Sequence, residues 1–219
     1  MMNGEVKSRM VVSITKEELG KLPMVHYVDG AEVVDTLEAV AAAVAHLRAT
    51  RIIGFDTETR PSFRKGVSHV VSLMQLASPE RCYLFRLNVL GMPEALKALL
   101  EDSKVRKVGI SLRDDFHSLS RICDLKPGGF VDLQEYVKRY RIADNSLARI
   151  YAILFGERIS KGQRLTNWEA AQLTAAQINY AAFDAISCIR IYDYIAGGRF
   201  EPTASKYYRK EEVYEQRRN

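Results

Sequence analysis

The chain has 219 residues, of which 47% are hydrophobic and 27% charged, a composition typical of a soluble globular domain with a sizeable core. Its formal net charge of +5 is compatible with a polyanionic partner. The N-terminus carries no evident signal peptide, and no stretch approaches the roughly 18 apolar residues of a membrane span. Three scattered cysteines argue against a disulfide framework or a zinc site. We therefore expect a cytoplasmic protein outside the membrane.

The first 30 residues are expected to form an accessory segment. Within it, Ser13-Ile-Thr-Lys-Glu-Glu18 has the pattern of a capped helix start. Short strands are expected at 22–28 and at Val33-Val34. A helix then begins at Thr36, because apolar residues recur at helical spacing after it.

The stretch Arg51-Ile-Ile-Gly-Phe-Asp-Thr-Glu-Thr59 predicts a buried strand that ends in two acids. Because side chains alternate along a strand, Asp56 and Glu58 should share one face while Thr57 points away. Two adjacent carboxylates repel each other unless a cation lies between them, and Mg²⁺ prefers such oxygen ligands. The alternative is a strand that runs into a solvated acidic turn.

The elements that follow predict a mixed α/β fold. Further strands are expected at 69–76, 82–87, 105–110 and 130–133. The first two form an antiparallel meander with the acidic strand, and the last two alternate with helices that begin near Pro93 and Arg113. We therefore expect a mixed five-stranded sheet, three antiparallel strands then two parallel ones, flanked by helices.

Two helices complete the expected domain at 31–198. One spans 146–156, and the last begins at the capping box Thr174-Ala-Ala-Gln177 and ends at Gly197. The tail at 199–219 mixes charges of both signs and is expected to be frayed or loosely docked.

Two further acids and a tyrosine are candidates for the same site. Tyr180 and Asp184 lie four residues apart on the last helix, hence on one face, although a half-exposed pair at the sheet edge would have the same spacing. Asp115 shares a helical face with Leu119 and Ile122, so it should point inward, whereas Asp114 should be solvated. Asp132 is the rival acid.

Three motifs resemble those of the DEDD superfamily of 3′–5′ exonucleases. They are Phe55-Asp-Thr-Glu58, Val108-Gly-Ile-Ser-Leu-Arg-Asp-Asp115 and Tyr180-Ala-Ala-Phe-Asp184. The tyrosine four residues before the last aspartate resembles the tyrosine subclass, DEDDy, which includes ribonuclease D and Werner-type exonuclease domains; the histidine subclass would place a histidine where Asn179 stands. Thr59 departs from that branch, which often has tryptophan there.

The resemblance implies an RNase H-like fold and a two-metal hydrolysis of phosphodiester bonds, with Mg²⁺ or Mn²⁺ as cofactor. By the motif match, Asp56, Glu58 and Asp184 hold the first ion. Asp56 bridges to the second ion, whose water shell Asp115 holds, and Tyr180 orients the attacking water. DNA or RNA would be shortened from its 3′ end with release of nucleoside 5′-monophosphates.

The sequence also offers candidate substrate contacts and leaves other functions open. The candidates for substrate binding are Thr57 and the cations of two acid-free loops, Arg60, Arg64, Lys65, Lys161 and Arg164. Either a single-stranded 3′ end or a short oligonucleotide would fit them. A catalytically idle nucleic-acid-binding domain on the same fold is the main alternative, and a structural protein with an acidic metal site is another.

Overall fold

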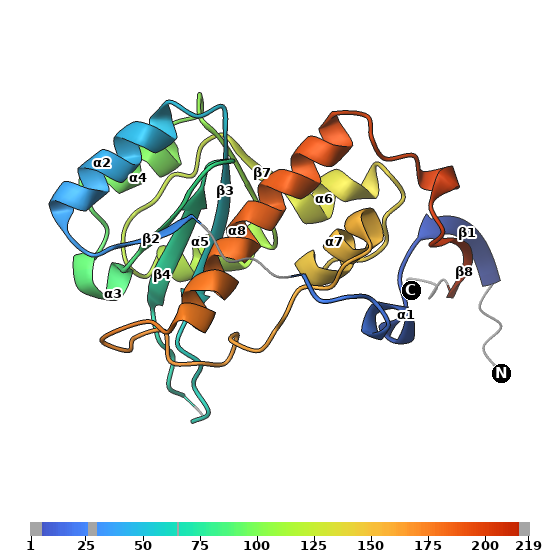
Figure 1. Ribbon diagram of the computed structural model, residues 1–219, viewed down its shortest axis with the longest axis horizontal. Coiled ribbons are helices and arrows are strands. Elements are labelled where there is room, and N and C mark those ends of the chain that lie inside the picture. Colours follow the sequence, from blue (N-terminus) through green and yellow to red (C-terminus); the bar gives the residue numbers. More distant parts are fainter. Residues whose placement is uncertain (1–5, 26–29, 65, 215–219) are drawn as a thin grey trace, which may run out of the picture.

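The computed structural model describes residues 6–25, 30–64 and 66–214, and its centre is a six-stranded mixed sheet in the order β2-β5-β4-β3-β6-β7 (Figure 1). The strands are β2 (Ala31–Val34), β3 (Ile52–Thr59), β4 (Val71–Ala77), β5 (Cys82–Phe85), β6 (Arg106–Gly109) and β7 (Phe130–Asp132). β3, β4 and β5 pair antiparallel, whereas β6 runs parallel to β3 and β7 to β6. The expected mixed α/β fold is confirmed, and β2, which pairs parallel with β5, adds a sixth strand to the five expected.

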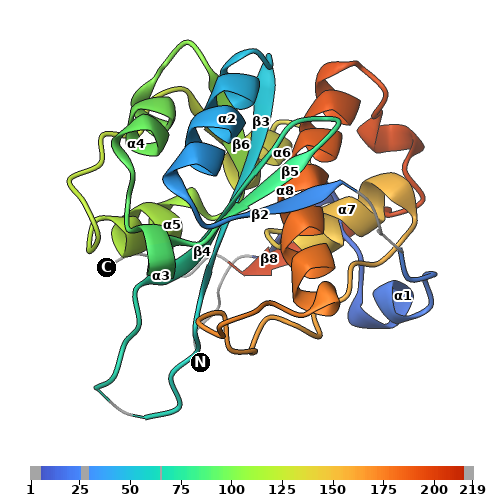
Figure 2. The ribbon, with the colours of Figure 1, turned by 60° about the vertical axis from the view of Figure 1, so that its left-hand side comes forward.

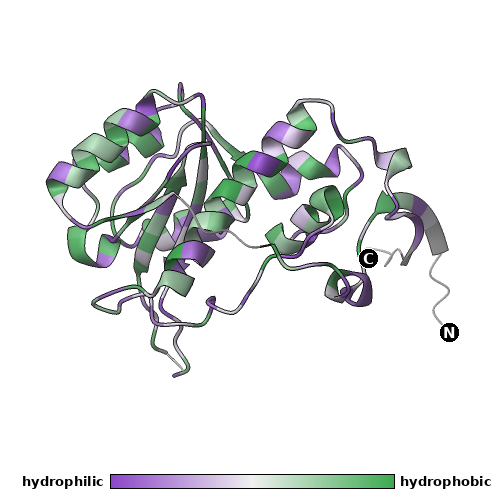
Figure 3. Cartoon of the chain, viewed as in Figure 1, coloured by the Kyte–Doolittle hydropathy of each residue, from purple (hydrophilic) through white to green (hydrophobic). Residues whose placement is uncertain are grey.

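Helices cover both faces of the sheet (Figure 2). They are α1 (Lys16–Gly20), α2 (Leu37–Arg48), α3 (Leu87–Leu90), α4 (Glu94–Glu101), α5 (Leu112–Leu119), α6 (Leu133–Lys138), α7 (Leu147–Phe155) and α8 (Ala175–Ala196). Helices α2, α4 and α5 share an apolar cluster with β3 and β4 on one face, while α6, α7 and α8 pack on the other. Figure 3 shows hydrophobic residues along α2, α8 and the strands between them. Within the described ranges, no helix combines the length and apolarity needed to cross a membrane.

Helix α8 is the long element that crosses the sheet, and it contacts β3, β4, β5 and β6. Its start is fixed by the expected capping box, in which Thr174 accepts a hydrogen bond from the Gln177 amide and the Gln177 side chain accepts one from the Thr174 amide. It packs directly on β3, because a Cβ at Gly54 would lie 2.0 Å from the Ala185 carbonyl oxygen. Only glycine permits so close an approach of helix to strand.

The segments that flank the expected 31–198 domain pair with each other. Strand β1 (Val6–Val12) forms an antiparallel two-stranded sheet with β8 (Tyr208–Tyr214), which a 3₁₀ turn at Pro202–Ala204 precedes. The described part of the tail, which ends at Tyr214, therefore differs from the frayed or loosely docked segment that its mixed charges predicted. Cross-strand pairing uses those charges, since Arg9 faces Glu211 across the ladder and forms an ion pair with it at 2.8 Å.

The N-terminal segment is also tied to the main body. The expected short helix is present as α1, with a complete capping box between Thr15 and Glu18. Just before it, the Ile14 amide donates to Asp144 at 2.9 Å, and Asp144 in turn pairs with Arg149 at 2.7 Å. Ile14 is buried in the same apolar cluster as α6 and α7. Of the strand expected at 22–28, residues 26–28 lie outside the described part, and in the described residues Met24 forms an isolated parallel bridge with Arg158.

Candidate active site

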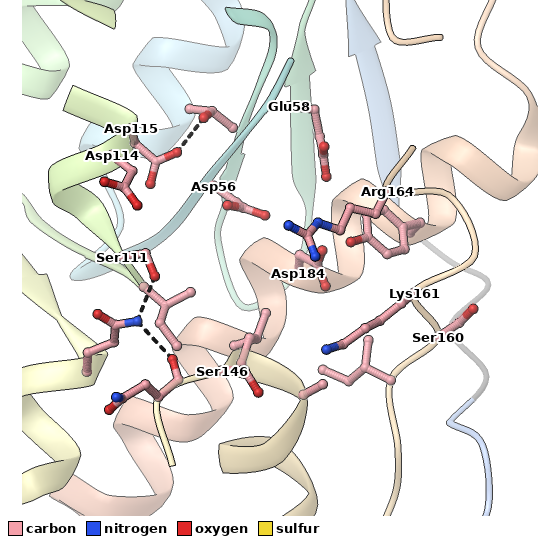
Figure 4. Close-up of a pocket in the computed structure, with 18 residues that line it drawn as sticks. Asp56, Glu58, Ser111, Asp114, Asp115, Ser146, Ser160, Lys161, Arg164 and Asp184 are labelled. Carbon is pink, nitrogen blue, oxygen red and sulfur yellow. Dashed lines mark hydrogen bonds between the residues drawn. The ribbon is translucent and has the colours of Figure 1, made fainter. Parts of the chain in front are cut away.

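Three carboxylates converge where β3 meets α8. Asp56 and Glu58 lie on β3, and Asp184 lies on α8, with one oxygen of each within 4.8 Å of the others. Strand alternation places Asp56 and Glu58 on one face of β3, as expected, and α8 packs against that face. The close approach at Gly54 then brings Asp184 against them. Figure 4 shows these three side chains facing one another.

This acid cluster is electrostatically unfavourable without a cation. Burial and the neighbouring carboxylates together raise the pKa of Asp56 well above its ordinary value. Burial, followed by the charge of Asp184, raises the pKa of Glu58 to about 9. The pKa of Asp184 is raised to about 7 by burial. Buried like charges are stabilised by protons or by a bound cation, so this donor set of hard oxygen ligands fits a divalent metal ion.

Asp115 joins the site from the opposite face of β3. Its carboxylate accepts a hydrogen bond from the Thr57 hydroxyl, and Thr57 points away from the face shared by Asp56 and Glu58. Burial raises the pKa of Asp115 to about 7. Asp115 lies outside the three-acid group of closest approach, yet it lines the same cleft. Thr57 thus holds an acid in place, a contact that alternation alone did not predict.

The two rival acids have other surroundings. Both oxygens of Asp132 accept backbone hydrogen bonds, one from Gln134 at 2.8 Å at the start of α6 and one from Leu112 at 2.9 Å at the start of α5. Asp132 therefore fixes the ends of two helices. Asp114 also lines the cleft, but it is exposed at the first turn of α5, whereas Asp115 is half-buried.

Tyr180 contributes a neutral phenol to the cleft. Burial raises its pKa above the ordinary value, and the charges of Asp184 and Glu58 act in the same direction. The phenol therefore keeps its proton and hydrogen-bonds to Asp184 one turn further along α8. The Tyr180 ring packs 6.1 Å from Trp168, which is fully buried and so belongs to the core.

The candidate cations divide into two groups. Lys161 and Arg164 line the cleft, and each lowers the pKa of an acid, Lys161 that of Asp184 and Arg164 that of Glu58. Figure 4 shows Arg164 reaching toward the acid cluster. Arg60 instead pairs with Glu169 at 3.0 Å and Arg64 is exposed, and neither lines the cleft. Lys65 lies outside the described residues.

The cleft also has a wall that the sequence did not reveal. The volume of the cleft is about 530 Å³. Ser111, between β6 and α5, has a left-handed backbone with φ of 58°, and the Gln134 side chain donates to Ser111 Oγ at 2.7 Å and to the Asn145 carbonyl at 2.9 Å. Glycine, Asn and Asp are the residues that indicate a positive φ in a sequence. Because the residue here is a serine, the sequence does not predict this turn.

Comparisons with known proteins agree with this site. A family model described as 3′-5′ exonuclease matches residues 31–197. The mouse bifunctional 3′-5′ exonuclease/ATP-dependent helicase WRN is 33% identical over 147 residues, which cover 64% of this chain and 10% of that protein. An Arabidopsis thaliana 3′-5′ exonuclease is 32% identical over 146 residues, which cover 64% and 51%.

The fold is shared with solved structures of that family. Trypanosoma brucei RNase D in complex with RNA U12 superposes with a TM-score of 0.66 at 24% identity, over 83% of this chain and 65% of that one. The chain belongs to the 3′–5′ exonuclease family, with its RNase H-like fold. It spans between a tenth and about half the length of the first curated relatives it matches.

Proposed function

We propose that this protein is a metal-dependent 3′–5′ exonuclease that hydrolyses DNA or RNA and releases nucleoside 5′-monophosphates. The observation that carries the proposal is the convergence of Asp56, Glu58 and Asp184 within 4.8 Å in one cleft with Tyr180. A phosphodiester is an anion, and a cleft that holds only buried acids would repel it. The acids therefore have a use in this reaction only as ligands of cations.

The four carboxylates of the site supply enough oxygen ligands for two divalent ions, Mg²⁺ or Mn²⁺. We assign Asp56, Glu58 and Asp184 to the first ion, and Asp56 together with Asp115 to the second. When bound, the two ions would supply a nucleophile at neutral pH and neutralise charge on the leaving oxygen. Thr57 supports this arrangement, because its hydroxyl holds the Asp115 carboxylate.

Tyr180 is assigned the role of positioning the attacking water. Its raised pKa rules out a role as general base at neutral pH, because the phenol stays protonated. As a hydrogen-bonding group anchored to Asp184, it can hold a water oxygen in line with the scissile phosphorus. Attack by that water breaks the bond between phosphorus and the 3′ oxygen, leaving a 5′-monophosphate and a new 3′-hydroxyl end.

The cations complete the proposed substrate contacts. Lys161 and Arg164 reach the cleft, so they can pair with phosphate oxygens at the reacting end of a single-stranded 3′ terminus or a short oligonucleotide. Arg60 and Arg64 belong to the loop after β3 and would meet substrate only beyond the cleft. A catalytically idle binding domain is the competing function, and the presence of all four acids and Tyr180 counts against it.

A panel of 5′-labelled DNA, RNA and dinucleotide substrates tests the proposal with Mg²⁺, with Mn²⁺ and with excess EDTA. We expect ladders that shorten from the 3′ end, release of 5′-monophosphates, and no hydrolysis in EDTA or with Asp184→Asn. Shortening only from the 5′ end, or equal hydrolysis in EDTA, would refute the assignment.

A further inference from the structure

A second hollow with a basic lining lies next to the catalytic cleft. Its volume is about 430 Å³. It is lined by Arg9, Met10, Val11, Lys138, Arg141, Ile142, Ala143 and Asn145. Three of these residues are cations and none is an acid. A concave surface with this lining attracts anions, and a phosphate-rich strand is the anion that the proposed function brings here.

The two hollows adjoin at Asn145, which lines both of them. The Asn145 carbonyl is held by the Gln134 side chain at 2.9 Å, and Gln134 also holds Ser111 at 2.7 Å in the wall of the cleft. The chain that separates the two hollows is therefore held in place by hydrogen bonds. A strand whose 3′ end reached the acid cluster could continue over Asn145 into the basic hollow.

Arg141 has the least usual backbone in this hollow. Its φ of 59° lies in the left-handed region, which is sterically unfavourable for a residue with a side chain. The strain is held in place because the Arg141 carbonyl accepts from the Val12 amide at 2.8 Å and its guanidinium donates to the Tyr208 hydroxyl at 2.7 Å. Strained residues of this kind are enriched at functional positions.

The existing partners of these cations are weak competitors for a phosphate. Arg9 pairs with Glu211 and Lys138 with Glu135, and all four side chains are at least 40% exposed. Such exposed ion pairs contribute little to stability, because water and salt screen them. Among the described residues, Arg141 has no carboxylate at ion-pair distance. The pKa of Glu201 is lowered mainly by hydrogen bonds from Thr203, and the charge of Arg141 adds a smaller effect in the same direction.

We propose that this hollow binds the phosphates of the substrate strand upstream of its reacting 3′ end. The inference rests on the proposed function for the direction of the strand. It goes beyond the family assignment, since Arg9 comes from β1, outside the matched residues 31–197. It makes the protein favour oligonucleotides long enough to reach from the acids to the hollow over dinucleotides.

Another basic hollow provides a matched control. It is lined by Arg51, Ser103, Lys104, Arg106, Gly129, Phe130 and Val131, again with three cations and no acid. These residues precede or begin β3, β6 and β7, whereas Asp56 and Glu58 lie in the second half of β3. A strand in the catalytic cleft would not extend to that opposite end of the sheet.

The test compares Lys138→Ala/Arg141→Gly with Arg51→Ala/Lys104→Ala, two variants of equal charge. Glycine at 141 suits the positive φ and so offsets the loss of the hydrogen bond to Tyr208, and thermal unfolding checks that both variants fold. Binding of a fluorescent phosphorothioate oligonucleotide of about ten nucleotides, which resists hydrolysis, is measured by anisotropy with Mg²⁺ across a range of salt. For two lost phosphate contacts we expect about tenfold weaker binding and a salt slope lower by about 1.4, while the control keeps the wild-type values.

Unchanged binding in the first variant, or an equal loss in the control, would overturn the proposal. The binding measurement needs no hydrolysis, so it fails separately from the proposed nuclease activity. Steady-state kinetics with Mg²⁺ give the second readout: KM for the longer oligonucleotide should rise about tenfold in the first variant, with kcat and the dinucleotide KM unchanged. An equal rise in KM for the dinucleotide would contradict an upstream subsite.

Discussion

Asp184 and Tyr180 occupy neighbouring turns of one helix and have different proposed roles in the reaction. The carboxylate is a proposed metal ligand, whereas the phenol stays neutral because burial and nearby carboxylates raise its pKa. The hydrogen bond between them fixes the phenol relative to the acid cluster. A contribution of Tyr180 to the reaction should therefore be seen in turnover rather than in affinity.

Replacing Tyr180 by Phe tests this at the level of one oxygen atom. We expect kcat to fall about 10²–10⁴-fold, while the Kd for single-stranded substrate changes little, because positioning water lowers the barrier more than it adds ground-state binding. The ring keeps its packing on Trp168, so the free energy of unfolding should change by less than about 1.5 kcal/mol. An unchanged kcat would mean that Tyr180 has only a packing role in the core.

The adjacent pair Asp114 and Asp115 gives a matched comparison of two acids in one cleft. Asp115 is held by Thr57, whereas Asp114 is exposed. Asp115→Asn should lower kcat by at least about 10²-fold and Asp114→Asn by much less. Circular dichroism and thermal unfolding check that both variants fold. If Asp114→Asn is the inactive variant, the assignment of the second metal ligand is wrong.

At the scale of elements, the site depends on how α8 meets β3. The apolar strand 52–59, the helical spacing of Tyr180 and Asp184, and the capping box at Thr174 are local patterns, and the structure confirms each element they predict. The pairing of β1 with β8 was not predictable, because the two strands lie at opposite ends of the sequence and carry mixed charges. Contacts of that kind leave no local pattern.

The cations illustrate the same limit. Arg60 and Lys161 both stand in acid-free loops, so composition made them equal candidates. The structure brings Lys161 into the cleft and pairs Arg60 with Glu169 outside it. Which loop folds over the site depends on the path of the chain between elements, and residue type alone does not fix that path.

Gly54→Ala tests the contact between strand and helix. The new methyl group would lie 2.0 Å from the Ala185 carbonyl oxygen, so α8 has to shift away from β3 and carry Asp184 with it. We expect a loss of about 1–3 kcal/mol in the free energy of unfolding, measured by urea denaturation, together with a lower kcat. Gly20→Ala is the control, since no atom lies within 4 Å of its added Cβ. Equal stability of both variants would contradict the close packing.

At the scale of the whole molecule, the acid cluster links stability, pH and metal. In the metal-free protein the pKa values of Asp115 and Asp184 are raised to about 7, above the values near 4 of an unfolded chain. The unfolded state therefore releases these protons first as pH rises. Stability contributed by the protonated acids is present below about pH 4 and is lost progressively up to about pH 7, with Glu58 extending the loss toward pH 9.

A divalent ion should reverse that loss. We expect Mg²⁺ to raise the Tm more at pH 8 than at pH 5, because the ion replaces protons that the folded acids have released. Differential scanning fluorimetry with and without Mg²⁺ at both values measures the difference, and Asp184→Asn should shrink it. A metal-induced shift of equal size at pH 5 and pH 8 would count against the cluster as the binding site.

A Mn²⁺ titration tests the proposed metal centre directly, with metal binding and hydrolysis of a 5′-labelled oligonucleotide followed on the same samples. We predict that shortening from the 3′ end rises over the range of Mn²⁺ in which the acid cluster fills, and that Asp184→Asn weakens both together. Hydrolysis that persists without bound metal, or metal binding that Asp184→Asn leaves unchanged, would contradict the assignment of Asp56, Glu58 and Asp184 as the metal centre of a nuclease.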